Sequence, residues 1–212
     1  MLRRLGKLLS SELVKAAVDD PDLKKDHSHP MEFYIYPPIS GEYQTSDIIR
    51  SKKNGNVSLI LTPSCDLVIR KDGKRNADKI LIVHTSKFKD TPEYKKYKEL
   101  QQKEIQSKAK GGVLRNEEAG QLKNLPERLM HMMRPGNKER FFFLPPTNFL
   151  EALLIDFQDK SSITYDELKK EYDVIATLDD PIAQSVLSSY SRYFSRIGYK
   201  DLDLEYTLKR LE

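Results

Sequence analysis

The sequence lacks the features that would place it in several large classes of protein. It contains a single cysteine, Cys65, so an internal disulfide framework is excluded and a reducing, cytoplasmic location is expected. It has no run of 18 apolar residues, so we expect no membrane span. The first ten residues are basic but lack the continuous apolar core and cleavage site of a signal peptide, and we interpret residues 2–18 as an amphipathic helix.

Metal ligands and repeats are also scarce. His27 and His29 lie beside Asp26, but no cysteine, histidine or acidic partner follows at ligand spacing. We therefore expect an exposed loop there, with no metal site and no cofactor. The chain shows neither an internal repeat nor a low-complexity linker.

Short apolar runs separated by turn residues indicate a mainly β structure. Asn54-Gly55 predicts a hairpin turn because both residues tolerate positive φ. After Cys65 comes a second apolar run, Leu67–Ile69, and then a further hairpin-type turn at 70–75. The strands that we expect lie near 31–36, after a turn within 41–50, and near 57–62, 79–84, 140–144, 149–157, 162–165 and 174–178, with a helical turn at 165–170 between the last two.

Two helices interrupt this β pattern. Residues 91–110 have a narrow apolar stripe ended by Gly111-Gly112, and a second helix is predicted at about 116–133. Asp179-Asp180-Pro181 predicts the start of a last helix, with Gly198 at its end. The organisation that we expect is an N-terminal helix and linker at 1–30 and one domain at 31–212, with a helical insertion at about 90–135.

The summed pattern predicts an α+β fold, mainly β, in which a small antiparallel barrel carries an inserted helical hairpin and terminal helices. The order of elements resembles the PemK/MazF-type toxin family, which has an SH3-like barrel. Four stretches carry the resemblance: 45–49, where Ser46 stands where glycine is usual, 58–63, 80–85, and 152–158 followed by Ile163. The resemblance covers 45–85 and 140–197.

This resemblance implies a ribonuclease, because members of the family cut RNA. Their threonine at the scissile phosphate corresponds to Thr85, whereas the arginine position falls near 54–57, where this chain has no arginine. Arg50 precedes the turn, and Lys52, Lys53 or Arg70 are the substitutes, although a lysine does not reproduce the arginine fork. If the protein is an enzyme, the resemblance implies a metal-independent endoribonuclease.

A second resemblance is to uncharacterised bacterial proteins of anti-phage or toxin-like loci. It is carried by the turn Thr62-Pro-Ser-Cys-Asp-Leu67 and by the stretch Arg140-Phe-Phe-Phe-Leu-Pro-Pro146. It implies a toxin-like or defence-associated context and no particular chemistry.

Cys65, Asp66 and His84 form a second candidate catalytic set, at the ends of strands that a hairpin would make neighbours. A cysteine nucleophile needs an imidazole within hydrogen-bond reach and an acid behind it. The structural alternative is a buried thiol, a carboxylate that accepts turn amides, and a histidine at a strand end.

Positive charge is concentrated in one segment. Residues 86–140 contain 14 Lys and Arg against 8 Asp and Glu, a net +6, so the remainder of the chain carries −2 of the total +4. Phosphate contacts and aromatic stacking there would bind single-stranded nucleic acid, whereas the alternative is a solvated helix whose tyrosines pack. The candidate residues are Lys87, Lys89, Tyr94, Lys95, Lys96 and Lys98, with Phe88, Tyr97, Lys103, Lys108 and Lys110 nearby and Arg192 and Arg196 on the last helix.

The sequence thus predicts a toxin-like or defence-associated module that binds a partner, with RNA or other single-stranded nucleic acid as the candidate ligand of the basic segment. One alternative is the endoribonuclease. The other is a protein-interaction domain without catalysis, in which Leu2, Leu5 and Leu9 dock a second protein or a second copy.

Overall fold

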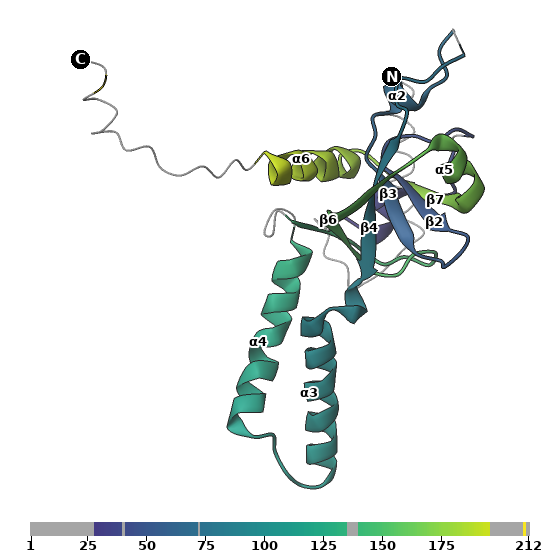
Figure 1. Cartoon of the computed structure of the whole chain (residues 1–212). Helices are drawn as coiled ribbons and strands as arrows, with labels where there is room; N and C mark the ends of the chain where they lie inside the picture. Colours follow the sequence, from purple (N-terminus) through teal and green to yellow (C-terminus); the bar gives the residue numbers. More distant parts are fainter. Residues whose placement is uncertain (1–27, 40, 72, 135–139, 196–209, 211–212) are drawn as a thin grey trace.

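The computed structural model describes residues 28–39, 41–71, 73–134, 140–195 and 210, and it has an α+β architecture (Figure 1). Strands dominate the body of the molecule, and two long helices separate β4 from β5. In chain order the elements are η1 (Pro30–Phe33), β1 (Tyr34–Ile35), β2 (Asp47–Ser51), β3 (Val57–Ile60), α2 (Ser64–Leu67), β4 (Ile80–Lys87), η2 (Phe88–Asp90), α3 (Pro92–Ala109), α4 (Asn116–Met133), β5 (Phe141–Leu144), β6 (Leu153–Ile163), α5 (Tyr165–Glu171), β7 (Tyr172–Leu178) and α6 (Ile182–Phe194).

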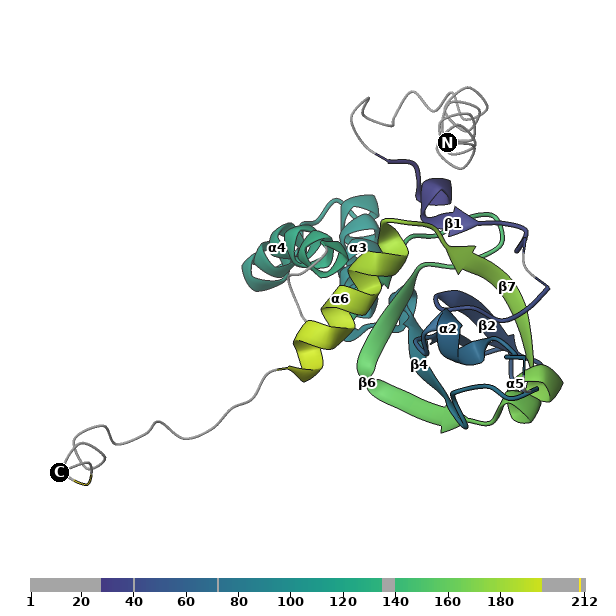
Figure 2. The ribbon, with the colours of Figure 1, turned by 90° about the horizontal axis from the view of Figure 1, so that it is seen from above.

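The strands form one seven-stranded sheet in the order β1-β7-β2-β3-β4-β6-β5. Every neighbouring pair is antiparallel. Seen from above, the sheet curls like the wall of half a barrel (Figure 2). The predicted α+β class and curled antiparallel sheet are therefore confirmed.

A local turn signal sets the β2–β3 hairpin. Gly55 has a φ of +74°, which a residue without a Cβ adopts at no steric penalty. The amide of Ser51 donates to the carbonyl of Asn56 at 2.9 Å, so the turn closes directly onto the strands. This is the hairpin turn that Asn54-Gly55 predicted.

Each face of the sheet carries its own hydrophobic core, because successive residues of a strand point to opposite faces. α6 covers the first core through Val186, whereas α2 and α5 cover the second through Leu67 and Leu168. The buried first core includes Ile48, Leu59, Val83, Ile155, Phe157, Ala176 and Val186, and the second comprises Ile49, Ile60, Leu67, Ile80, Ile82 and Leu168.

Aromatic contacts join the two outer edges of the curled sheet. The buried phenol of Tyr34 in β1 donates to the carbonyl of Pro145, just after β5, at 2.7 Å. Next to it the ring of Tyr36 stacks on that of Phe149, with centroids 3.9 Å apart and planes at 5°. Burial raises the pKa of Tyr34 well above its usual value, so the phenol stays a donor.

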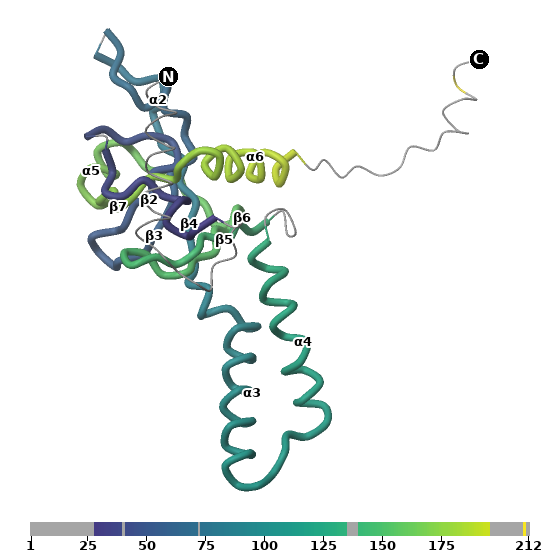
Figure 3. The backbone as a smooth tube through the Cα atoms, turned by 180° about the vertical axis from the view of Figure 1, so that it is seen from behind, coloured from purple at the N-terminus to yellow at the C-terminus, as the bar shows by residue number. Residues whose placement is uncertain are grey.

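Helices α3 and α4 form an arm (residues 88–134) that extends away from the sheet (Figures 1 and 3). α3 begins at Pro92 because the hydroxyl of Thr91 accepts the amide of Tyr94 at 3.3 Å. It ends before Gly111, whose φ is +74°. The base of the arm packs on β5 and β6 in a third core, made of buried Phe88, Leu129 and Leu154 with Tyr94, Tyr97, Met132, Phe141 and Phe143 against them.

Several expectations for the body were wrong. The two strands predicted at 149–157 and 162–165 are one strand, β6, and α6 ends at Phe194 with Ser195 as its C-cap instead of at Gly198. Half of the strand predicted at 31–36 is the 3-10 helix η1, because His29 and Glu32 form a reciprocal capping box at its first turn. The run after Cys65 forms α2 and then two exposed residues, Val68 and Ile69, so the turn at 70–75 connects a helix to β4. α2 contributes its last residue, Leu67, to the second core.

Several predictions concern residues outside the described ranges. They are the helix at 2–18, the loop histidine His27, Arg196, and the chain end beyond Gly198. Within the described ranges, none of the helices combines the length and the apolar character needed to cross a bilayer.

Ser46 is under conformational strain, and we predict that Ser46→Gly stabilises the fold. Ser46 has a φ of +68°, it is buried, and its hydroxyl finds no hydrogen-bond partner among the described residues. Relief of the left-handed backbone and removal of the unpaired hydroxyl together outweigh the entropy of glycine, for a net gain of about 1 kcal/mol in unfolding free energy. Urea denaturation measures this gain.

Ser86→Gly is the matched control, since Ser86 is an exposed residue of β4. The control should be destabilising, because glycine weakens an extended strand. A Ser46→Gly variant less stable than the wild type would contradict the strain argument.

Candidate functional site

The turn that contains Cys65 is held by the hydroxyls around the cysteine. Thr62 accepts the amide of Leu81 at 2.7 Å, and Ser64 accepts the amide of Thr45 at 2.9 Å. Cys65 itself is exposed, with its Sγ 3.7 Å from the Oδ1 of Asp66. This segment therefore anchors α2 to the sheet and leaves the thiol outside.

Asp66 faces another partner in addition to the thiol. Its Oδ1 accepts a hydrogen bond from the Nδ2 of Asn76 at 3.1 Å, and its carbonyl accepts the amide of Ala77 at 3.2 Å. The carboxylate thus fastens Asn76 to α2 through a side-chain amide, and not through the backbone amides of a turn as the sequence suggested. The buried thiol of that alternative is wrong, because Cys65 is exposed.

His84 lies between two serine hydroxyls on neighbouring strands. Its Nδ1 is 2.9 Å from the Oγ of Ser58 in β3, and its Nε2 is 3.0 Å from the Oγ of Ser161 in β6. The side chain of His84 is half-buried and its ring plane is fixed from both ends. We call Ser58, His84 and Ser161 the serine–histidine relay.

The structure does not bring Cys65 and His84 together. Leu61 bonds to Leu81, and α2 begins beyond this pair, whereas His84 pairs with Ser58 three positions further along the ladder. At a rise of 3.3 Å per residue, three positions correspond to about 10 Å. A Cys–His–Asp nucleophile is therefore not assembled.

Thr85 lies on the opposite face of the sheet from His84. It pairs with Ile155 of the first core, and its hydroxyl donates to the carbonyl of Val57 at 2.8 Å. Arg50 pairs with Val57 from the other side, so Arg50 and Thr85 flank one residue on one face. Their backbones are two strand spacings apart, about 10 Å.

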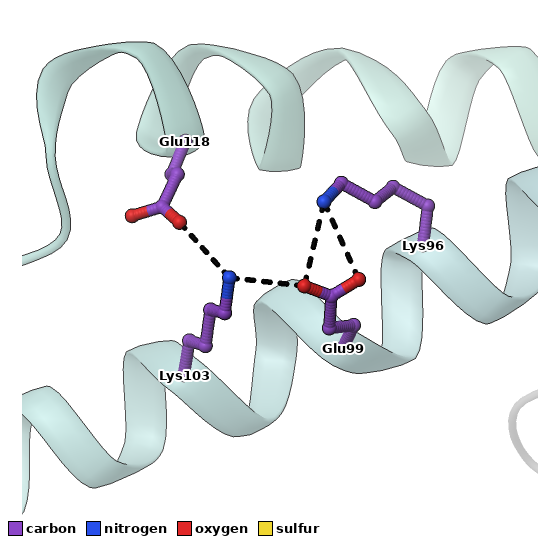
Figure 4. Close-up of polar contacts among 4 residues, drawn as sticks. All are labelled: Lys96, Glu99, Lys103 and Glu118. Carbon is purple, nitrogen blue, oxygen red and sulfur yellow. Dashed lines mark hydrogen bonds and ion pairs between the residues drawn. The ribbon is translucent and has the colours of Figure 1, made fainter.

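Most lysines of the arm, together with Lys87, are ion-paired to neighbouring acids. Lys103 bridges the two helices, since its Nζ lies 2.9 Å from Glu99 in α3 and 3.1 Å from Glu118 in α4 (Figure 4). Lys96 shares Glu99 with it at 3.3 Å. The other pairs are Lys87 and Lys89 with Glu151, Lys95 with Asp90, and Lys108 with Glu104.

Glu151 shows how strongly one such cluster of lysines shifts the pKa of the acid that it surrounds. The ammonium groups of Lys89 and Lys87 both donate to its carboxylate and lower its pKa to about 2. The same contact raises the pKa of Lys89. Lys87 and Lys89 therefore join the base of the arm to the segment before β6, and an outside anion has to displace Glu151 to bind them.

Lys98 differs from its neighbours because the groups that it contacts are neutral. Its ammonium lies 5.9 Å from the ring centroids of both Tyr94 and Tyr97 and 3.1 Å from the side-chain oxygen of Gln101. Tyr94 and Tyr97 both pack against the third core, in line with the packing alternative. On α6, Arg192 donates to the hydroxyl of Ser189 at 3.3 Å.

A groove of about 800 Å³ separates α3 from α4 on one side of the arm. Its floor is apolar at Leu125 and Met132, and its rim carries both signs of charge, including Glu93, Lys96 and Arg128. In the described part of the chain no three His, Cys, Asp or Glu side chains gather as a metal site would require.

Neither a family model, nor a curated protein, nor a solved structure matches this chain. The site must therefore be judged on its own geometry. The residues that sequence reasoning missed are Ser58 and Ser161, which carry no motif. Only the register of β3, β4 and β6 identifies them as neighbours of His84.

We predict that the Thr62–Asp66 turn serves stability. Ser64→Ala leaves the amide of Thr45 without its acceptor and should lower the unfolding free energy by about 1 kcal/mol. Cys65→Ala, the adjacent and exposed control, should change it by less than about 0.5 kcal/mol. Urea midpoints of the two variants measure the difference, and a larger loss for Cys65→Ala would contradict the assignment.

Proposed function

We propose that this protein is a partner-binding module whose arm contacts single-stranded nucleic acid, with RNA as the first candidate. The observation that supports the proposal is the placement of the arm. It extends from the sheet, and it packs on the sheet only at its base (Figure 1). Most of both helices is therefore available to a partner.

The charge of the arm favours a polyanion. Residues 88–134 hold 11 Lys and Arg and 7 Asp and Glu, which gives 11 − 7 = +4, the whole net charge of the chain. Ion pairs between exposed side chains contribute little to stability, so phosphates can exchange with the acids that now hold the lysines. Counterion release then supplies binding free energy.

Lys98 and Tyr97 give the arm a local contact point. The ammonium over two tyrosine rings sits beside half-buried aromatic faces, and a base stacks on such a face while the lysine meets its phosphate. This pairing of a cation with rings distinguishes this part of α3 from an ordinary solvated helix.

The curled sheet supports a wider proposal about family. An SH3-like barrel of the PemK/MazF type, in a toxin-like or defence-associated bacterial context, remains our interpretation of stretches 45–49, 58–63 and 80–85. The left-handed backbone of Ser46 agrees with it, because glycine is usual at that position in the family that the chain resembles.

The binding proposal predicts a large effect of charge reversal on α3. Replacing Lys95, Lys96 and Lys98 together by Glu should weaken binding to a labelled single-stranded RNA. It should also reduce the slope of log affinity against log salt by about 2, because about 0.7 counterions are released per phosphate contact on a single strand. Fluorescence anisotropy over a range of salt concentrations measures both quantities.

The matched control carries the same change of charge on the body of the molecule. Lys79, Lys169 and Lys170 are exposed residues just before β4 and in α5, and their replacement by Glu should leave the salt slope close to that of the wild type. Equal loss in both triple variants would mean non-specific attraction. No RNA binding by the wild type would favour the protein-interaction alternative, in which Leu2, Leu5 and Leu9 act.

Endoribonuclease activity is the second candidate, and the placement of Arg50 favours it. Arg50 is the substitute that we propose for the arginine missing at 54–57, since Arg50 and Thr85 share a face beside Val57, and the guanidinium would exchange its bond to the carbonyl of Phe149 for a phosphate. A guanidinium there would stabilise the charge that develops on a phosphoryl group.

If this candidate is correct, Thr85→Ala and Arg50→Ala should each reduce metal-free RNA cleavage by about 10²-fold or more, the usual effect of removing one charge-stabilising group. Thr85→Ser keeps the hydroxyl and should retain activity. Gel analysis of a labelled RNA provides the measurement. Intact RNA after incubation with the wild type would refute cleavage and leave the binding proposal standing.

A further inference from the structure

The serine–histidine relay has the geometry of a nucleophile, a base and an orienting group. Ser161 and Ser58 lie 3.0 and 2.9 Å from the two nitrogens of His84. Ser58 is only 2% exposed, whereas His84 and Ser161 are half-buried and reach solvent. The buried hydroxyl is therefore placed to orient the ring, and the accessible one to react.

The sheet is irregular at this point. Val83 pairs with Lys160 but Thr85 pairs with Ile155, so residues 156–159 of β6 lie opposite the single residue His84. Bulges of this kind redirect side chains and are over-represented beside active sites. Here the slip leaves Ser161, the partner of Ile82, as the diagonal neighbour of His84.

We propose that Ser161 is a nucleophile towards activated carboxylic esters, with His84 as its general base and Ser58 as a positioning residue. In the productive tautomer of His84, the Nδ1–H group donates to the Oγ of Ser58, and Nε2 accepts the proton of the Ser161 hydroxyl. A hydroxyl is activated when a base lies within hydrogen-bond reach and a third group holds that base. The proposal is independent of nucleic-acid binding by the arm.

The reaction is acyl transfer followed by hydrolysis. The Oγ of Ser161 attacks the acyl carbon while its proton moves to Nε2 of His84. The bond from the acyl carbon to the leaving oxygen then breaks, and the leaving alcohol takes that proton. Water, with His84 again as the base, cleaves the acyl–Ser161 ester to release the acid and restore the hydroxyl.

The surroundings favour an acyl group over a phosphoryl group. Ile163, two residues after Ser161, lies on the same face and packs on the second core. Lys160 belongs to the opposite face, where its ammonium lies 3.4 Å from the ring centroid of Phe194. The nearest cation in the sequence is therefore turned away from the hydroxyl.

A fluorophosphonate probe tests the proposal on the full chain. Ser161 should attack phosphorus and displace fluoride, with its proton passing to His84, and peptide mapping should place the label on Ser161. Ser161→Ala should abolish labelling. Ser162→Ala, which removes an exposed hydroxyl on the other face of the same strand, should leave it unchanged. His84→Gln should slow labelling by about 10²-fold, the contribution of a general base.

A further measurement separates the relay from a merely structural contact. Ser58→Ala should slow labelling of Ser161 by more than any loss of folded protein accounts for, because Nδ1 of His84 loses the hydroxyl that orients the ring. Ser58→Thr keeps a hydroxyl at this position and should retain labelling. An unchanged labelling rate in Ser58→Ala, a label on another serine, or no label on the folded wild type would overturn the proposal.

Discussion

The pairing of β4 with β6 is the contact on which the rest of the structure depends. It joins Ile80 to Ile163 at one end and Lys87 to Leu153 at the other. Residues of this one ladder belong to all three cores, since Ile155, Ile82 and Leu154 are buried in the first, second and third respectively. If this pairing were lost, the two faces of the sheet and the base of the arm would lose their packing together.

The same ladder explains how the fold accommodates a projecting arm. The arm and β5 lie between the paired strands in sequence, so the ladder closes a long loop. Loop-closure entropy grows only slowly with length, and a helical hairpin that packs at its base adds little to it. Phe88 donates its amide to the carbonyl of Ala152 at 2.8 Å, where the arm leaves the sheet.

The lysines of the arm form local ion pairs, and the arm as a whole keeps a net positive charge. Lysines spaced three or four residues from glutamates form pairs along α3, such as Lys103 with Glu99. The remaining excess of positive charge is left on an element that stands clear of the body. Composition alone revealed the excess, whereas the tertiary structure decides that the arm carrying it packs on the sheet only at its base.

The sequence by itself determined the type and order of most elements, because those signals are local. Gly55 and Gly111 adopt positive φ, and a capping hydroxyl at Thr91 opens α3. The partners of His84 were decided only in three dimensions. Register depends on pairing between β4 and distant strands, and a slip of one residue moves every side chain to the other face. That is why Cys65 seemed a neighbour of His84 from the order of strands, while Ser58 and Ser161 hold it in the folded chain.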